Sequence, residues 1–259
     1  MGMVVTNPKA KHVKIGIVVS SYRALAIFLR SAGRAGRLPD YIVLEGPLAG
    51  GHLGFGDDWA DYNLCTLLQE LLAYMKEKDI NIPVLAAGGV FGGQDAVKLM
   101  ELGASGVQVA TRFAITKESG LPDVAKQAYL HAKKEDVVVS HVSPTGYPIR
   151  LLKNSPCLAS NVKPNCELFG YVLNDNGTCQ YLDAYQNALN GVPSQKDLGV
   201  INDKICLCYH FSKCNCYTCG ANVYKLKELL PPATNGIFDL PTTEEVFLDY
   251  RDNEGLSTL

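Results

Sequence analysis

A histidine set among glycines is the residue of this sequence whose surroundings most strongly suggest chemistry. His52 follows Gly50 and Gly51 and precedes Gly54, directly after the apolar run YIVLEG. Glycines on both sides would let the imidazole closely approach a bound ligand. An ordinary histidine pKa of about 6.5 suits proton transfer or stabilisation of a substrate anion. A lone histidine is more often a packing or surface residue, but this context favours a catalytic role.

Two further strand ends have features of a phosphate site. The stretch AAGGVFGG places Gly88 and Gly89 between an apolar run and a helical pattern, so backbone N–H groups and a helix N-terminus could meet at one anion. The next run, VQVATRF, ends in Thr111 and Arg112. In β/α barrels that bind a phosphorylated cofactor, the last two strand–helix loops usually hold the phosphate. A simple tight turn explains the two glycines equally well.

The cysteines gather in the second half of the chain, and of the nine only Cys65 precedes Cys157. In a reducing cytosol such clustering indicates metal ligation or free thiols more than disulfides. One stretch, CLCYHFSKCNCYTCG, has enough soft ligands for zinc or an iron–sulfur centre: Cys206, Cys208, Cys214, Cys216 and Cys219, with His210 nearby. It lacks a clean pair of C-x-x-C knuckles, so ordinary reduced thiols are the favoured explanation. A bound metal would fasten the tail and take no part in catalysis.

The elements that must position these residues repeat as strand, loop and helix. Apolar runs at 13–19, 41–46, 82–89 and 106–113 predict strands, and helical spacing follows each of them, at 22–36, 63–80, 93–103 and 123–134. Continuously apolar strands are buried on both faces. The pattern therefore predicts an α/β fold with a parallel sheet covered by helices.

Beyond Glu135 this pattern ends. VVVSHVSPTGYPIRLLKNSP is rich in turn residues, and the chain that follows is rich in Asn, Cys and Tyr. CQYLDAYQNALNG predicts a helix ending near Gly191, VPSQKDLGVINDK predicts a loop, and ANVYKLKELLP predicts a short final helix. We therefore expect a β/α part at 1–154 and a Cys-rich, helical and irregular tail at 155–259.

Composition narrows the classes of partner. The chain has 259 residues, of which 47% are hydrophobic and 19% charged, and a net charge of -2, values typical of a soluble globular protein. Dispersed charges give no basic stripe for nucleic acid or a membrane surface. No apolar run approaches the roughly 20 residues of a membrane span, and the first residues lack the order of a secretion signal. We expect a cytoplasmic protein that binds small molecules.

Three motifs carry a resemblance to a known family. PDYIVLEGPLAGGHLGF, IPVLAAGGVFGGQDAVKLMELGASGVQVATRFAITKES and SPTGYPIR occur in the order and spacing of the nitronate monooxygenases, formerly called 2-nitropropane dioxygenases. The related FMN-dependent enoyl-acyl-carrier-protein reductases are similar as well. The resemblance runs from about Val13 to Asn154, and a weaker one continues through CQYLDAYQNALNG and GANVYKLKELLP. This family is a TIM barrel that binds FMN at the carboxyl ends of its strands.

The resemblance implies a role for each matched residue. The FMN phosphate would be held by Gly88, Gly89, Gln108, Ala110 and Thr111, Gly50 and Gly51 would pass close to the flavin, and His52 would be the active-site histidine. The implied reaction is oxidation of an alkyl nitronate by flavin and molecular oxygen to a carbonyl compound and nitrite. NADH-dependent enoyl-acyl-carrier-protein reduction is one alternative, and a truncated, non-catalytic flavin- or metal-binding protein is another. Ala110 stands where the family usually has glycine, and its methyl group could crowd the phosphate.

Family members begin with four further β-α units that have no counterpart here. The chain thus resembles the C-terminal half of the barrel, with its last four β-α units, followed by the family's tail. A half barrel has unpaired strand edges and an uncovered inner face, which invite pairing with another chain. Three explanations stay open: the chain is a fragment, two copies pair into a whole barrel, or a separate chain supplies the first half.

Overall fold

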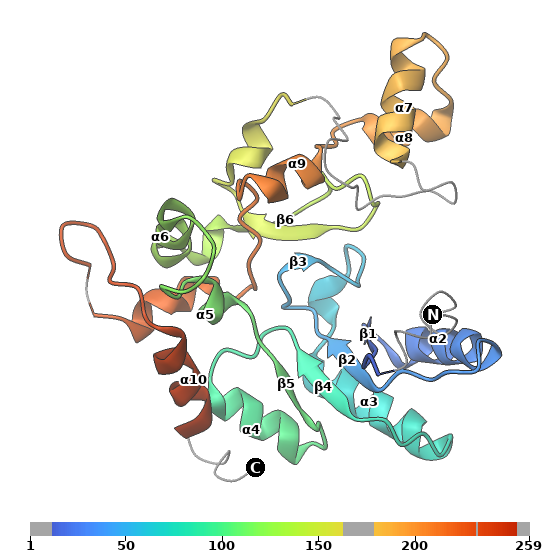
Figure 1. Ribbon diagram of the computed structural model, residues 1–259, viewed down its shortest axis with the longest axis vertical. Coiled ribbons are helices and arrows are strands. Elements are labelled where there is room, and N and C mark those ends of the chain that lie inside the picture. The colour runs from blue at the N-terminus through green and yellow to red at the C-terminus, as the bar shows by residue number, and fades with distance from the viewer. Residues whose placement is uncertain (1–11, 163–178, 232, 253–259) are drawn as a thin grey trace. The chain divides into compact units, whose positions relative to one another are not determined.

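The structure is a computed structural model of the chain that describes residues 12–162, 179–231 and 233–252 (Figure 1). The chain divides into two compact units, each assembled from separate stretches of sequence. Unit 1 comprises residues 1–49, 58–110 and 243–259, and unit 2 comprises residues 50–57 and 111–242. This grouping by proximity does not test the predicted division at residue 154, which stays a prediction.

Unit 1 is built around a four-stranded parallel sheet. The strands β1 (Gly16–Val19), β2 (Tyr41–Glu45), β4 (Val84–Ala87) and β5 (Gly106–Gln108) lie in the order β1-β2-β4-β5. Three helices connect them in turn, α2 (Tyr22–Arg34), α3 (Leu64–Glu77) and α4 (Gly93–Glu101), and α10 (Thr243–Asp252) packs against α4. A short 3-10 helix, η2 (Trp59–Asp61), precedes α3. The predicted α/β class with a parallel sheet is confirmed.

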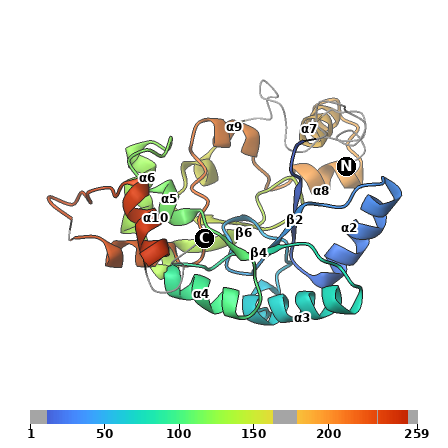
Figure 2. The same cartoon turned by 60° about the horizontal axis from the view of Figure 1, so that its bottom comes forward.

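The helices α2, α3 and α4 of unit 1 cover one face of this sheet. Figure 2 shows α2, α3 and α4 along the same side of the strands. On β2 the consecutive residues Ile42, Val43 and Leu44 are all buried, at 0%, 3% and 0% exposure. One row of residues runs Val18, Val43, Leu85 and Gly106 across the sheet, and on the edge strand Val18 is 61% exposed. Edge strand β1 thus presents an apolar side chain on the face away from the helices.

Unit 2 contains a three-stranded antiparallel sheet in the order β3-β7-β6. Its strands are β3 (Gly51–His52), β6 (Val137–Ser140) and β7 (Ile149–Leu152). Its core cluster joins Ile149, Leu151 and Cys157 to Leu207 and Cys216. The helices are α5 (Thr111–Ala114), α6 (Asp123–His131), α7 (Gln180–Leu189), α8 (Gln195–Ile201) and α9 (Leu207–Ser212), with 3-10 helices η3 (Lys134–Asp136), η4 (Pro156–Ala159) and η5 (Val223–Leu229).

Two predictions for the second half were wrong. The stretch 137–156, interpreted as rich in turns, also contains the strands β6 and β7, and all four residues of β7 are buried. The predicted loop at 192–204 contains α8, which begins with a capping box between Ser194 and Asp197. The predicted final helix at 221–231 is the 3-10 helix η5, and α10 follows it. The helix ending near Gly191 is confirmed as α7, and Gly191 has a φ of 75°.

None of the helices in the described part of the chain is both long and apolar enough to span a bilayer.

Candidate functional site

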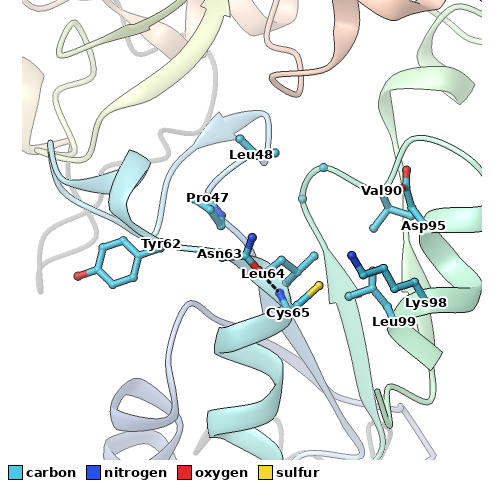
Figure 3. Close-up of a pocket in the computed structure, with 12 residues that line it drawn as sticks. Pro47, Leu48, Tyr62, Asn63, Leu64, Cys65, Val90, Asp95, Lys98 and Leu99 are labelled. Atoms are coloured by element: carbon cyan, nitrogen blue, oxygen red, sulfur yellow. Dashed lines mark hydrogen bonds between the residues drawn. The ribbon is translucent and has the colours of Figure 1, made fainter. Parts of the chain in front are cut away.

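A cavity of about 250 Å³ lies at the carboxyl ends of β2 and β4 in unit 1 (Figure 3). Gly88 and Gly89, which follow β4, form part of its wall. Lys98 extends from α4 toward the first turn of α3. Among the described lining residues, it is the one with a positively charged side chain. The rest of the lining comes from the loop after β2, the start of α3 and α4: Pro47, Leu48, Tyr62, Asn63, Leu64, Cys65, Val90, Asp95 and Leu99.

Backbone geometry requires glycine at both positions of the pair. Gly88 and Gly89 have φ values of 88° and 94°, a region that side chains disfavour. A Cβ atom on Gly88 would lie 2.8 Å from the carbonyl oxygen of Gly46, and one on Gly89 would lie 3.0 Å from the Cβ atom of Leu48. The tight turn therefore explains why glycine occurs here. The glycine pair also gives the cavity wall a stretch of backbone that bears no side chains.

A side-chain carboxylate of the chain already occupies the N-terminus of α4. One carboxylate oxygen of Asp95 accepts hydrogen bonds from the backbone N–H groups of Phe91, at 2.8 Å, and Gly92, at 3.2 Å. The sequence suggested free N–H groups at this helix start, but these two donors are engaged. A phosphate at this point would also lie beside a like charge, so the partly buried backbone of Gly88 and Gly89 on the cavity wall is the better candidate for anion contact.

The remaining predicted phosphate residues belong to both units. Gln108 ends β5 and Ala110 follows it, and both are exposed residues of unit 1. Thr111 begins α5 in unit 2, where its hydroxyl oxygen accepts a hydrogen bond from the N–H group of Gly220 at 3.1 Å. Their role at a phosphate stays a prediction from the resemblance.

His52 is held in unit 2 by a short strand and a buried hydroxyl group. Its strand β3 pairs with β7, with His52 opposite Ile149. The Nε2 atom of His52 lies 2.7 Å from the Oγ atom of Ser143, which is fully buried, and that Oγ atom lies 2.7 Å from the Oγ1 atom of Thr145. Burial lowers the pKa of His52 below its ordinary value. A neutral imidazole with a fixed ring follows, and this is the form that can accept a proton.

Ser143 and Thr145 were not predicted as members of the site. Both lie in SPTGYPIR, where Ser and Thr side chains followed by Gly were interpreted only as turn residues. Their hydroxyl groups do form such turns, since the N–H group of Thr145 donates to the Ser143 Oγ atom at 3.2 Å. The available signal was a hydroxyl-rich turn within a motif of the resembled family.

A small cavity of about 20 Å³ adjoins His52 in unit 2. Its wall comes from the turn after β6, the start of α7 and the start of α9. The lining residues are His52, Pro144, Thr145, Cys179, Tyr181, Cys206, Leu207 and Cys208. The histidine therefore faces a space whose other walls are mostly apolar side chains and thiols.

The glycines before His52 have different structural environments. A Cβ atom on Gly50 would lie 2.4 Å from the carbonyl carbon of Cys219 and 2.7 Å from the nitrogen of Gly220. Position 50 therefore requires glycine, because the peptide between Cys219 and Gly220 occupies the place of a side chain. Gly51 has a φ of 75°, and a Cβ atom there would meet nothing within 4 Å. Backbone conformation alone explains Gly51, and proximity of either glycine to a flavin stays a prediction.

The predicted metal centre finds no support in the structure. Within the described ranges, no three side chains of His, Cys, Asp or Glu are placed to share a metal ion. Cys216 hydrogen-bonds with Cys157, and this contact together with burial raises its pKa. Burial raises the pKa of Cys219 to about 12, which disfavours the thiolate that metals bind. Cys206 and Cys208 instead line the cavity at His52, so cysteines adjacent in sequence do not converge.

Comparison with known proteins identifies the family. The model of the nitronate monooxygenase family matches residues 2–171. The chain belongs to the nitronate monooxygenase family. It is 37% identical over 152 residues to a probable nitronate monooxygenase of Staphylococcus saprophyticus, in an alignment that covers 58% of this chain and 41% of that protein. It is 34% identical over 113 residues to a 5-hydroxy-7a-methyl-1-oxo-octahydro-1H-indene-4-carboxyl-CoA dehydrogenase of Rhodococcus jostii, covering 44% of this chain and 29% of the relative.

Solved structures give the same fold. FabK from Thermotoga maritima is similar with a TM-score of 0.56 at 20% identity, over 97% of this chain and 65% of FabK. A nitroalkane oxidase from Streptomyces ansochromogenes is similar with a TM-score of 0.52 at 18% identity, over 92% of this chain and 57% of the oxidase. At these identities the likeness shows the fold alone. The chain spans less than half of the curated relatives named here and less than two thirds of these structures.

Proposed function

We propose that this chain carries the histidine-bearing part of an FMN-dependent oxidoreductase that oxidises alkyl nitronates with molecular oxygen to carbonyl compounds and nitrite. The observation that carries the proposal is the environment of His52. Its ring is half-buried, hydrogen-bonded to Ser143, and faces a small cavity. Membership of the family and the probable nitronate monooxygenases among its relatives support the same reaction.

His52 has the properties that this reaction requires. Because burial lowers its pKa, the imidazole is neutral at physiological pH and can accept a proton from a nitroalkane or donate a hydrogen bond to a nitronate oxygen. The hydrogen bond between Nε2 and Ser143 fixes the orientation of the ring. It can do so both when the imidazole accepts a proton and when it donates a hydrogen bond. Bound FMN would supply the electron-transfer chemistry with oxygen. We assign His52 as base or anion stabiliser.

The glycine-lined cavity of unit 1 fits the phosphate end of FMN. Gly88 and Gly89 present backbone without side chains, and Lys98 gives a positive charge on the same wall. The volume of about 250 Å³ is below the roughly 300 Å³ at which pockets for whole drug-sized ligands begin, so it suits part of the cofactor. In this proposal the two glycines and Lys98 hold the phosphate.

We further propose that the parallel sheet of unit 1 is half of a β/α barrel. The order β1-β2-β4-β5, helices on one face and an exposed Val18 on the other support this assignment. The chain's 41% coverage of the staphylococcal relative is consistent with it. A second copy of this chain or a separate chain would then supply the remaining strands. Eight described cysteines are free thiols, which suits the reducing cytoplasm where we place the protein.

Reduction of an enoyl thioester by NADH is the second candidate. The likeness to FabK over 97% of the chain and the identity to a carboxyl-CoA dehydrogenase favour it over other flavin reactions. The two functions differ in their electron donor. An enoyl reductase would oxidise NADH in the presence of a crotonyl thioester and would leave ethyl nitronate unchanged.

The decisive experiment combines three measurements on the purified full-length chain: the absorbance spectrum, the mass in solution by light scattering, and oxygen consumption with ethyl nitronate. Flavin bands with nitronate-dependent oxygen consumption and nitrite release would support the proposal. Flavin bands with activity only toward NADH and crotonyl thioester would replace it by the second candidate. A yellow protein inert toward both substrates would make it a non-catalytic flavin-binding protein.

A further inference from the structure

We propose that Cys157 and Cys216 of unit 2 are a redox-sensitive thiol pair, which hydrogen peroxide converts to a disulfide that fastens the 215–220 segment to η4. The two cysteines belong to the core of unit 2 and are separate from the described lining of the cavity at His52. The step needs neither flavin nor nitronate, so it is independent of the proposed reaction.

The backbone brings the two cysteines together. Leu151, at the end of unit 2's central strand, forms an antiparallel bridge with Thr218. Further along, the N–H group of Cys157 donates a hydrogen bond to the carbonyl oxygen of Asn215 at 3.1 Å. Cys216 lies between these two contacts in the sequence. Its position opposite Cys157 is therefore fixed by backbone contacts on both sides.

The side chains of the pair meet in the core. Cys157 and Cys216 are 0% and 8% exposed, and their thiols hydrogen-bond to each other. The N–H group of Tyr217 donates to the Oγ atom of Ser155 at 3.1 Å, which holds the backbone next to Cys216 in place. A disulfide requires its two Sγ atoms to be about 2.05 Å apart. Thiols that are already in contact need only a small shift to reach that distance.

The hydrogen bond makes the two thiols unequal. The Cys216 thiol donates to the sulfur of Cys157 and lowers the pKa of Cys157. Because the thiolate is the nucleophile, Cys157 is the sulfur that reacts first.

The reaction has two steps. The Cys157 thiolate attacks one oxygen of hydrogen peroxide, the O–O bond breaks, and hydroxide leaves and takes up the proton that Cys157 released. The sulfur of Cys216 then attacks the resulting sulfenic acid at Cys157, the S–O bond breaks, and water leaves with the proton of Cys216. The two thiols lose two electrons and two protons, and the peroxide becomes two molecules of water.

Burial of the pair selects the oxidant. Cys157 has no exposed surface and Cys216 has little, so glutathione disulfide is too large to reach either sulfur in the folded chain. Hydrogen peroxide has only two heavy atoms and can enter through a small opening of the core. In a reducing cytoplasm such a disulfide would be transient, as redox-sensing disulfides there usually are.

The cross-link would act on the segment that backs His52. Shortly after Cys216, the peptide between Cys219 and Gly220 lies against Gly50, the residue before β3. A bond from Cys216 to the core therefore limits how far this segment can open.

The test treats the reduced full chain with hydrogen peroxide, stops the reaction with catalase, unfolds the chain and labels the remaining thiols with N-ethylmaleimide for an intact mass. We expect two of the nine thiols to be lost first, and dithiothreitol to restore both. Glutathione disulfide should leave all nine thiols in the folded chain. Oxidation of the pair by glutathione disulfide as fast as by peroxide would overturn the choice of oxidant.

Three variants identify the pair. Cys157→Ala should lose neither thiol in this first phase, whereas Cys216→Ala should stop at a sulfenic acid on Cys157 that dimedone traps. Cys214→Ala is the matched control, because Cys214 is a half-buried cysteine on the same stretch, and it should still lose two thiols. A reversible loss of two thiols in Cys216→Ala, or its absence in Cys214→Ala, would overturn the proposal. If Cys157→Ala does not fold, Cys216→Ala decides.

Urea unfolding gives a second measurement that requires no labelling. The disulfide closes a long loop, so the oxidised native chain and oxidised Cys214→Ala should unfold at a higher urea concentration than their reduced forms. Oxidised and reduced Cys216→Ala should have the same midpoint. A native chain that keeps all nine thiols under peroxide, with an unchanged midpoint, would overturn the proposal.

Discussion

Among the described histidines, His52 combines a hydrogen bond to a buried hydroxyl group with a cavity beside its ring. We expect His52→Ala to keep the flavin and to lower turnover by about 100-fold or more, because a positioned acid or base contributes at least that much. The flavin-to-protein absorbance ratio and kcat are the measurements. Loss of flavin together with activity would instead make His52 a structural residue.

The pH dependence of the reaction follows from the lowered pKa of His52. Burial disfavours the charged imidazolium, so the neutral ring persists below the ordinary value of about 6.5. If the neutral form is required, kcat/KM should be constant near neutral pH and fall in acid through a pKa lower than about 6.5. A pH profile of kcat/KM in the native chain and in Ser143→Ala checks this. If kcat/KM of Ser143→Ala decreases in acid at the same pH as that of the native chain, then Ser143 does not influence the group that titrates.

His210 gives a separate prediction for stability. It is 2% exposed, and within the described ranges neither ring nitrogen has a hydrogen-bond partner. Burial lowers its pKa, so below about pH 6.5 the unfolded chain binds more protons than the folded one and stability falls as the pH drops. At higher pH, His210 is neutral in both the folded and the unfolded chain, so it does not lower the stability.

The variant His210→Phe should therefore show a smaller decrease in melting temperature between about pH 7.5 and about pH 5.5 than the native chain. His12→Gln is the control, because His12 is exposed. An equal decrease in the native chain and in His210→Phe would show that protonation of His210 does not destabilise the fold.

For single residues, the sequence predicts only those features that depend on neighbouring positions in the chain. Glycines around His52 are visible in the sequence, and the catalytic role of its half-buried ring stays a prediction. The cysteine cluster was misleading because spacing in a sequence does not say which way side chains face. Cys216 turns toward Cys157 in the core, whereas Cys208 lines the cavity at His52. Ser143 could not be recognised, since its partner is 91 residues away.

Gly50, the residue before β3, lies against the backbone of the 219–220 segment. Gly50→Ala would place a Cβ atom 2.4 Å from the carbonyl carbon of Cys219, which forces the backbone to move. We expect a loss of about 1–3 kcal/mol, typical of overpacking. Gly199→Ala in α8 is the control, because its Cβ atom would meet nothing within 4 Å and alanine favours the helix. Urea unfolding of both variants measures the difference, and equal midpoints would contradict the close packing.

The start of α4 depends on Asp95 as its cap. Asp95→Ala removes the acceptor of the Phe91 and Gly92 N–H groups and should lower stability by about 0.5–2 kcal/mol. Glu101→Ala at the other end of α4 is the control, and as an exposed surface change it should stay within about 0.5 kcal/mol. Chemical denaturation decides, and a native-like midpoint for Asp95→Ala would show that these hydrogen bonds contribute little.

The elements of the parallel sheet were predictable because their apolar runs are continuous and bounded by glycine or helical spacing. The antiparallel strands were not, because β3 has only two residues and β7, Arg150 included, is buried at all four positions. The helix α8 was missed because Pro193 and Gly199 suggested a loop, although Ser194 and Asp197 are a recognisable capping box.

At the scale of the whole molecule, the open edges of the parallel sheet predict association. Among the strands of the described residues, β1 and β5 are the two edges, and Val18 is 61% exposed on β1. If a second copy completes the sheet, the native chain should have the mass of a dimer in light scattering, and Val18→Lys should shift it toward the monomer. Val124→Lys is the control, because Val124 is 69% exposed on α6. The same mass for the native chain and Val18→Lys would contradict pairing through this face.

The repeated strand–helix pattern predicted the architecture of the first half, but the grouping into units could not be inferred. Residues 50–57 leave unit 1 in the middle of its sheet, and residues 243–259 return to it from the far end of the chain. Such exchanges depend on contacts between distant residues, as between Tyr250 on α10 and the 90–91 loop, and no local pattern records them.

This return of α10 has a consequence for biosynthesis. The Tyr250 hydroxyl donates to the carbonyl oxygens of Val90 at 3.4 Å and Phe91 at 3.0 Å, next to the glycine pair. During translation the histidine-bearing unit emerges entirely before α10, so the contact of Tyr250 with the 90–91 loop forms only after α10 leaves the ribosome. We predict that nascent chains ending at Thr242 protect His52's surroundings from a protease while the 88–91 loop remains cleavable, and equal protection of both would contradict this order.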